Sequence, residues 1–258
     1  MRELSKRSIN AEAEEEGYFI SMSDMLVGLL FVFIILLVYF AVTFKQKEDY
    51  LVGAGEARKK LLERLEKDIE QKLPGVDVVI DTETGILRLP EEVLFDSNEY
   101  ELSQRGQAAV KIVADILATR LPCYTKSADL SLIRCSGPEE SHKIDTLLVE
   151  GHTDSDPIKG DLTGLGNLDL SARRASRTYL ALTLAQPGLD KLTNGDDLQP
   201  TPVLGVAGYG PHRPVLQSSG KPLPDSEKAR HRRIDLRFIM VTPKSDAAEK
   251  ANKLLRSK

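Results

Sequence analysis

The sequence predicts an α+β protein with one N-terminal transmembrane helix, a connecting helix and a single mixed α/β sandwich domain. Three observations predict this: an uncharged apolar run, an amphipathic run that stops at Pro74 and Gly75, and strand patterns that alternate with helix patterns further along. The expected boundaries are a tail at 1–17, the transmembrane helix at 18–44, the connecting helix at 45–75, the domain at 76–243 and a second tail at 244–258.

The transmembrane helix is predicted by the twenty uncharged residues Met25 to Phe44, which would form a helix of about 30 Å. Asp24 is the only charged residue in the segment 18–44. It can cap the helix at the lipid headgroups together with Ser21 and Ser23. Alternatively it lies inside the span, because the residues before it are apolar or amphipathic too. In that case helices from other chains must enclose it, since a single helix gives a carboxylate no shelter from lipid.

Composition excludes several classes of function. The chain has 258 residues and a net charge of −4, without a basic tract or aromatic platform of the kind that binds nucleic acid. The apolar run is too long for the hydrophobic region of a signal peptide, and no small-residue cleavage site follows it, so we expect an uncleaved anchor. Basic residues lie on both sides of the helix, so their number does not decide which side is cytoplasmic.

The connecting helix carries a narrow apolar stripe among Lys, Arg and Glu. The residues of this stripe recur at helical spacing: Leu51, Ala54, Leu61, Leu65, Ile69 and Leu73. Such a stripe is typical of a helix that pairs with a copy of itself or lies on a membrane surface. A solvated spacer helix fits the pattern equally well, and the choice between a plug and a coiled stalk stays open.

From residue 76 onward the pattern is that of a globular domain. Strands are predicted at 76–80, 85–90, 146–150, 203–207 and 234–241, and amphipathic helices at 103–120 and 171–184. Loops rich in Pro, Gly, Ser and Asp are predicted at 186–202 and 211–226.

Cys123 and Cys135 are the two cysteines of the chain and are separated by eleven residues. In an oxidising compartment they would close a hairpin-like loop as a disulfide, whereas in a reducing compartment they would stay buried thiols. Their spacing is not that of a zinc site, which uses pairs such as CxxC.

Charged residues gather in two motifs of the domain, GHTDSDP at 151–157 and NLDLSARRA at 167–175. The first motif follows a buried strand, and strand ends commonly present ligand-binding residues. Arg173, Arg174 and Arg177 lie near the start of the next predicted helix. Asp154 opposite one of these arginines suits a zwitterion, because the carboxylate takes an ammonium group and the guanidinium takes a carboxylate. A structural salt bridge between the strand end and the helix is the alternative.

Two other kinds of chemistry are disfavoured. His152 and Asp154 form an HxD pair, but the remaining histidines, His142, His212 and His231, do not have the spacing of a metal motif. No nucleophile motif such as GxSxG is present. We therefore expect neither a metal site nor catalytic residues.

Five runs of the domain resemble OmpA-like peptidoglycan-binding domains, in family order. They are LFDSNEYELSQRGQ, LLVEGHTDSDP, NLDLSARRAS, GYGPHRP and KARHRRIDLRF, which together cover about residues 93–241. The resemblance implies that Asp154 and Arg174 hold diaminopimelate of the cell-wall peptide. Asn167, Leu170 and Ser171 match the family's NxxLSxxRA pattern, and Asn167 is expected to belong to the binding site.

The resemblance also implies supporting residues and a location. Candidates for supporting contacts are His152, Ser171, Arg232 and Arg233, whereas His231 stands where the family usually has Asn. A peptidoglycan-binding domain implies the periplasm, and therefore a single-pass protein of the bacterial inner membrane with a cytoplasmic N-terminus. In that compartment Cys123 and Cys135 are expected to form the disulfide.

The whole layout resembles the B subunits of flagellar stators, and more closely the stator-like B subunit of the Zorya anti-phage defence system. The resemblance implies a homodimer whose two helices lie inside a ring of five A subunits, with Asp24 as the proton-carrying residue. The few hydroxyl groups beside Asp24 favour protons over sodium, and no further cofactor is expected. The alternatives are a flagellar stator subunit for motility and a passive peptidoglycan tether.

Overall fold

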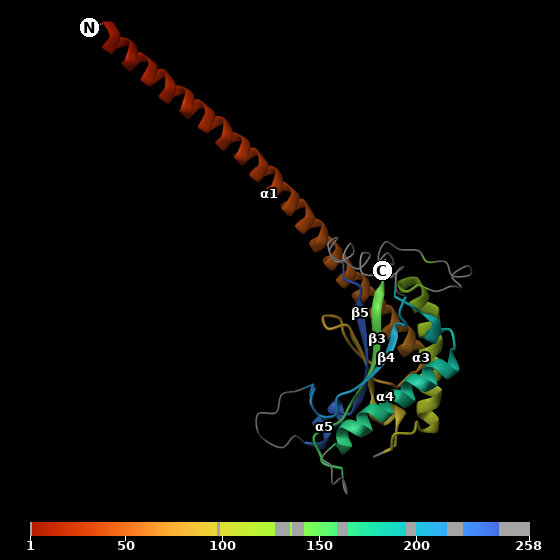
Figure 1. The fold of residues 1–258 in the computed structure, drawn as a ribbon. Helices are drawn as coiled ribbons and strands as arrows, with labels where there is room; N and C mark the ends of the chain where they lie inside the picture. Colours follow the sequence, from red (N-terminus) through yellow and green to blue (C-terminus); the bar gives the residue numbers. More distant parts are fainter. Residues whose placement is uncertain are drawn as a thin grey trace, which may run out of the picture. The chain divides into compact units, whose positions relative to one another are not determined.

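The computed structural model describes residues 2–96, 99–126, 135, 142–158, 165–194, 200–215 and 224–242, with residues 2–21 as backbone. The chain divides into two units, Met1–Tyr50 and Leu51–Lys258, and helix α1 (Arg2–Lys72) contributes residues to both (Figure 1). The expected C-terminal tail at 244–258 lies outside the described residues.

The first unit contains the apolar run of α1. Its most apolar stretch has a mean hydropathy of 3.1, and none of that stretch is buried within the chain. Among the described residues this is the one helix that is long and apolar enough, by length and composition, to cross a membrane. A helix that is apolar on every face needs lipid or partner helices around it when its own chain does not cover it.

Asp24 lies in the interior of α1 and not at its start. Because the helix begins at Arg2, the amides that follow Asp24 already have carbonyl partners in the preceding turn. Of the two alternatives for Asp24, the one in which it caps the helix with Ser21 and Ser23 is therefore wrong. The side chain of Asp24 is exposed, so none of the described residues shields it.

The second unit begins with the C-terminal part of α1, where most of the predicted apolar stripe is buried, although Leu51 at its start is exposed and Leu73 at its end is half-buried. Ala57, Leu61 and Leu65 are fully enclosed. Polar contacts hold the same segment, since Arg58 donates to the Glu83 carbonyl at 2.6 Å and Arg120 pairs with Asp68 at 2.8 Å. The stripe thus packs within its own domain and is not left for a second copy or a membrane surface. The compact unit accordingly starts at Leu51 and not at the expected residue 76.

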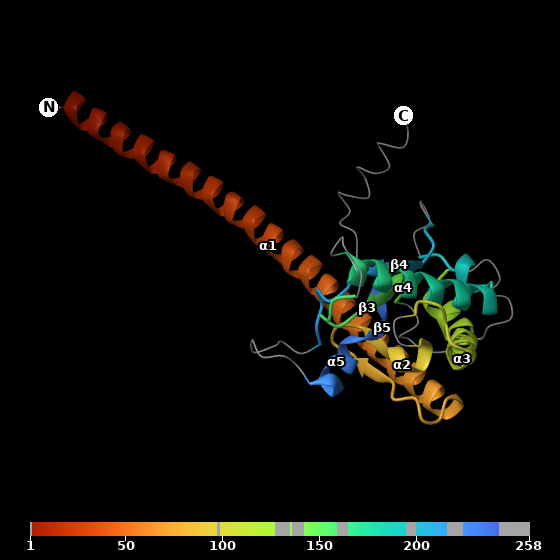
Figure 2. The same cartoon turned by 90° about the horizontal axis from the view of Figure 1, so that it is seen from below.

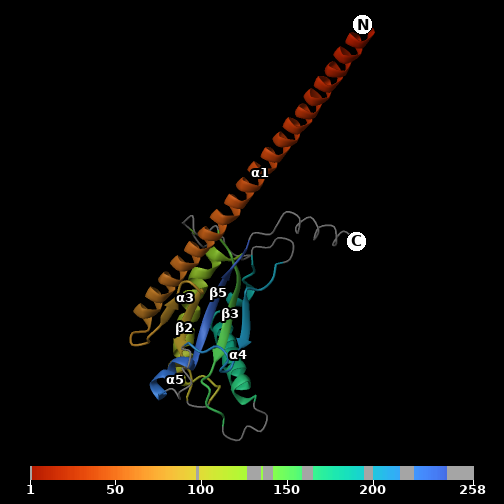
Figure 3. The ribbon, with the colours of Figure 1, turned by 90° about the vertical axis from the view of Figure 1, so that its left-hand side faces the viewer.

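The strands of the described residues form one five-stranded sheet in the order β1-β2-β5-β3-β4. Their bounds are β1 Val79–Asp81, β2 Ile86–Pro90, β3 Ile144–His152, β4 Leu204–Gly208 and β5 Arg233–Met240. Strands β3 and β4 are parallel, and every other pair is antiparallel. Figure 3 shows β2, β5 and β3 side by side. The register places Glu150 opposite Asp235, and His152 opposite Arg233.

Two long helices pack on the sheet and on each other. Helix α4 (Gly166–Ala185) contacts β3 and β4, and α3 (Gln104–Arg120) contacts α4 (Figure 2). The side chain of Ser103 caps α3 by accepting a hydrogen bond from the Gly106 amide at 3.0 Å. The predicted strands and helices are present, but β3 extends to His152 and α4 begins at Gly166, before the predicted start.

Several short elements were not predicted from the sequence. Helices α2 (Glu91–Leu94) and α5 (Asp225–His231) each follow a proline, and acidic residues in their first turns suit the positive helix end. Short 3₁₀ turns lie at η1 (Leu121–Tyr124) and η4 (Leu189–Lys191). Cys123, in η1, is joined to Cys135 by a disulfide. Because α2 follows β2 and α5 precedes β5, both short helices lie at strand ends and contribute to the site described below.

Candidate functional site

A cavity of about 660 Å³ lies where α2, the loop after β3, the start of α4 and the end of α5 meet. Its lining includes Glu91, Asp154, Asn167, Arg174 and Arg232. Sequence analysis assigns Asp154, Asn167, Arg174 and Arg232 to one site, and the structure brings all four to this cavity.

Asp154 lies two residues after the end of β3 and pairs with Arg232. Oδ2 of Asp154 is 2.7 Å from Nη1 of Arg232, and Oδ1 accepts from the Asp156 amide at 3.2 Å. The Arg232 side chain is 36% exposed and that of Asp154 12%, so the pair opens to water mainly through the guanidinium. Burial works against the charge of Arg232, but the hydrogen bond with Asp154 outweighs it and raises the pKa of Arg232.

Arg174, on α4, is almost fully enclosed, at 2% exposed. Its Nη1 lies 2.6 Å from Oε2 of Glu91, its Nε donates to the Glu99 carbonyl at 2.8 Å, and its guanidinium lies over the Phe95 ring. Burial lowers the pKa of Arg174 and raises the pKa of Glu91, although the attraction between the two side chains opposes both shifts.

The two residues of the predicted zwitterion site therefore do not pair with each other. Asp154 is held by Arg232, and Arg174 is held by Glu91. The alternative of a salt bridge between Asp154 and this helix is wrong, because the arginine that contacts Asp154 lies between α5 and β5. Two carboxylates and two guanidinium groups in one cavity can exchange their internal partners for the ammonium and carboxylate groups of a zwitterion.

Close packing of α4 on the sheet positions the helical residues of the site. A Cβ atom on Gly151 would collide with the Ser171 carbonyl, so this approach of β3 and α4 requires glycine. The hydroxyl of Ser171 accepts from the Gly210 amide at 2.9 Å and donates to the Leu168 carbonyl at 2.8 Å. Ser171 thus supports the site through the backbone and does not line the cavity.

Asn167 connects the start of α4 to the loop that carries Asp154. Its side-chain amide donates to the Asp156 carbonyl at 2.8 Å. The carboxylate of Asp156 in turn pairs with Lys228 on α5 at 2.8 Å. These contacts hold the loop between two helices, so the position of Asp154 depends on both.

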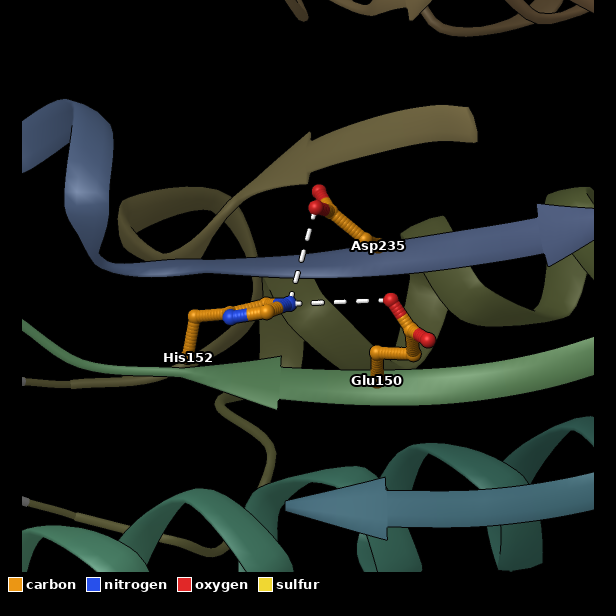
Figure 4. Close-up of side chains that lie close together, drawn as sticks. All are labelled: Glu150, His152 and Asp235. Carbon is orange, nitrogen blue, oxygen red and sulfur yellow. Dashed lines mark ion pairs between the residues drawn. The ribbon is translucent and has the colours of Figure 1, made fainter. Parts of the chain in front are cut away.

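A second group of charges, the buried cluster of Glu150, His152 and Asp235, lies between β3 and β5 (Figure 4). Nε2 of His152 is 3.8 Å from Oε2 of Glu150 and 3.5 Å from Oδ2 of Asp235. None of the three side chains is more than 1% exposed. Burying two carboxylates is costly unless positive groups compensate them.

Three arginines compensate the acids of the buried cluster at short distance, and a fourth, Arg213, lies 3.8 Å from Glu150. Arg237 pairs with Glu150 at 2.8 Å. Asp235 pairs with Arg233 at 2.9 Å and with Arg88 at 3.0 Å. Burial would raise the pKa of Glu150, but contacts with His152 and Arg237 outweigh it and lower this pKa to about 2. Burial lowers the pKa of His152, which favours the neutral imidazole.

The buried cluster has a donor set that resembles a metal site, but its charges do not suit a cation. A divalent ion would lie beside three guanidinium groups that already neutralise both carboxylates. We interpret the cluster as an ion-pair network that joins β3 to β5. Because β3 leads into Asp154 and β5 follows Arg232, His152 and Arg233 support the site through the strands and do not line the cavity.

The remaining candidates have structural roles. Nδ1 of His231 accepts from the Val215 amide at 3.2 Å, so this buried histidine holds the chain beside the cavity. Arg173 pairs with Asp169 at 2.7 Å, and Arg177 pairs with Glu101 at 2.5 Å. Neither of these two arginines lines the cavity, so of Arg173, Arg174 and Arg177 on α4 only Arg174 belongs to it.

Glu91 is the site residue that sequence reasoning missed. It is the first of two adjacent glutamates after Pro90, and this position is ordinary for a helix start. A signal was present, because the glutamates interrupt two apolar runs, ILRLP and VLF. A carboxylate between two buried runs needs a partner, although the sequence does not identify it.

No protein-family model and no curated protein matches this sequence. Solved structures with a similar fold include the cell wall anchor of the T6SS from Pseudomonas aeruginosa, at 19% identity and a TM-score of 0.45, which covers 70% of this chain and 97% of that chain. Another is a periplasmic domain of Helicobacter pylori MotB, at 17% identity and a TM-score of 0.44, and the match covers 73% of this chain and 93% of that chain. A third is the peptidoglycan-associated lipoprotein from Burkholderia pseudomallei, at 20% identity and a TM-score of 0.33, and the match covers 57% of this chain and 87% of that chain. At these values the likeness assigns no function.

Proposed function

We propose that the chain is the peptidoglycan-anchored B subunit of a proton-driven motor complex in a bacterial inner membrane, of the Zorya anti-phage type. The observation that carries this proposal is the combination, in one chain, of an acid-bearing apolar helix with a cavity lined by two ion pairs, Asp154 with Arg232 and Glu91 with Arg174. The resemblance of the domain motifs to OmpA-like domains supports the anchoring role, and the order of the segments supports the motor role.

The anchor would bind diaminopimelate, whose free end carries an ammonium group and a carboxylate on one carbon. In this proposal Asp154 takes the ammonium group and Arg174 takes the carboxylate. Asn167 keeps the loop of Asp154 in place. A charged pair on each side of the cavity would orient the zwitterion in one direction, which distinguishes it from a simple cation or anion.

The anchoring role is tested by sedimentation with purified peptidoglycan sacculi. The full-length chain with Asp154→Ala and Arg174→Ala should stay in the supernatant, whereas the wild-type chain should sediment. Arg177→Ala is the matched control, because Arg177 lies on the same helix but does not line the cavity. Equal sedimentation of the double variant and the wild type would disprove the site.

The motor role would depend on Asp24. We propose that two copies of the chain lie within a ring of five A subunits, and that protons from the periplasm reach Asp24 and leave to the cytoplasm. Each protonation removes a charge from a site of low dielectric constant, which changes the preferred packing of the surrounding helices. The anchored domain would turn that rearrangement into torque against the cell wall.

The motor role is tested with Asp24→Asn, which has nearly the same shape but cannot carry a proton. The variant should assemble with the A subunits and lose phage protection. Asp49→Asn serves as the control, because Asp49 lies on the same helix outside the apolar run and pairs with Lys45 at 3.2 Å. Full protection by Asp24→Asn, with sacculus binding unchanged, would leave only a passive tether.

A further inference from the structure

The contact between Glu91 and Arg174 bears on how the proposed ligand enters the cavity. Of the three guanidinium nitrogens of Arg174, Nε donates to the Glu99 carbonyl and Nη1 contacts Glu91, while Nη2 has no hydrogen bond among the described residues. A carboxylate binds an arginine most strongly through two neighbouring nitrogens. In Arg174 each such pair of nitrogens includes either Nε, which donates to the Glu99 carbonyl, or Nη1, which contacts Glu91.

The bond of Nε to the Glu99 backbone anchors the side chain, so the contact with Glu91 is the one that a ligand can replace. Oε2 of Glu91 lies close to Nη1 but is not aligned for a hydrogen bond with any described residue. The raised pKa of Glu91 and the lowered pKa of Arg174 both indicate that their attraction does not fully compensate their burial. An ion pair of this kind is exchangeable for a better-aligned carboxylate.

Glu91 also has space to move. It is 8% exposed and lines the cavity, next to Glu92, whose side chain is exposed. We infer that Glu91 is a built-in competitor, which occupies on Arg174 the position that the carboxylate of the cell-wall ligand takes. This inference rests on the proposed function. It means that the ligand must displace an internal carboxylate before Arg174 can bind it.

The competitor lowers the affinity of the empty site, and removing its charge should raise that affinity. We expect Glu91→Gln to bind meso-diaminopimelate about tenfold more tightly than the wild type, which is the ratio expected when a competing charged contact is removed. Glu92→Gln is the matched control, because it removes the same charge from the neighbouring position of the same cavity wall without touching Arg174. It should change the affinity less than twofold, as expected for an exposed charge.

The experiment uses the full-length chain in detergent micelles, with calorimetric titration of meso-diaminopimelate and sedimentation with sacculi. Weaker binding by Glu91→Gln, or a gain no larger than that of Glu92→Gln, would overturn the inference. If thermal melting shows that Glu91→Gln is not folded, Glu91→Asp replaces it. The shorter acid keeps the charge but withdraws it from Arg174, so it should tighten binding by a smaller factor, and weaker binding would overturn the inference.

The same titration distinguishes the competitor role of Glu91 from the proposed anchoring function on which it rests. A wild-type chain that binds both probes, with no gain in Glu91→Gln, disproves the competitor and leaves the anchor intact. A wild-type chain that binds neither probe disproves the cell-wall function and the inference together.

Discussion

Two groups of acids and arginines occupy the same end of the sheet, and they differ in their access to the cavity. The buried cluster consists of Glu150, His152, Asp235 and their three arginines, and its acids are fully enclosed. The cavity cluster consists of two ion pairs, Asp154 with Arg232 and Glu91 with Arg174, which line an open cavity. The same residue types therefore hold the strands together in one place and remain open to a ligand in the other.

The difference shows how burial decides what an ion pair does. A fully enclosed pair has no water or ligand to replace its partner, so removing one member leaves an uncompensated charge. A pair that is open to water at a cavity wall, such as Asp154 with Arg232, can exchange its partner for water or for a ligand. Its loss should therefore cost less stability, although it should weaken ligand binding. The three predictions below separate the two clusters by this criterion.

The largest effect on stability is expected from Asp235→Ala. The buried Arg233 and the half-buried Arg88 would then lose their shared carboxylate, so we expect a loss of about 3–5 kcal/mol in the free energy of unfolding. Urea denaturation of the full-length chain in detergent micelles measures this loss. Asp169→Ala, which breaks the exposed pair with Arg173, should cost less than about 1 kcal/mol. Equal losses in the two variants would contradict the distinction.

A smaller effect is expected from the protonation of Glu150. Its pKa is about 2 in the folded chain, compared with its ordinary value of 4.5, so the folded state binds its proton less readily than the unfolded state. The stability that it contributes is therefore complete above about pH 5 and decreases as the pH falls toward 2, by about 3 kcal/mol in total.

Glu150→Gln isolates this contribution. The difference in unfolding free energy between the wild type and Glu150→Gln should stay constant from pH 7 to about pH 5 and shrink as the pH is lowered further to 3, as followed by urea denaturation at each pH. A difference that stays constant over this range would show that the pKa of Glu150 is the same in the folded and the unfolded chain.

The smallest effect on stability is expected in the cavity cluster. Arg232→Ala removes the partner of Asp154, but this pair opens to water, so the free energy of unfolding should fall by about 1 kcal/mol or less. Sacculus binding should weaken, because the loop that carries Asp154 loses a contact. A loss of stability as large as that of Asp235→Ala, with binding intact, would place Arg232 among the structural arginines.

Much of the fold follows from local patterns in the sequence. The apolar run of α1, the amphipathic helices α3 and α4, and the strands that lead into and out of the site were predicted, because each depends on residues that are close along the chain. The short helices α2 and α5 were missed, since they have too few residues to show a helical period. The start of the domain was placed too late, because the stripe of Leu61 and Leu65 indicates burial but not the surface that buries it.

The sequence by itself determined that one helix is apolar on every face, that Asp24 accompanies it, and that Asp154, Asn167, Arg174 and Arg232 are suited to a common site. Only the tertiary structure decided which charges are partners: Glu91 with Arg174, Asp154 with Arg232, and the arginines around Asp235. The physical reason is that electrostatic energy depends on distance and burial in space. Glu91 and Arg174 are 83 positions apart in the chain, but 2.6 Å apart in the fold.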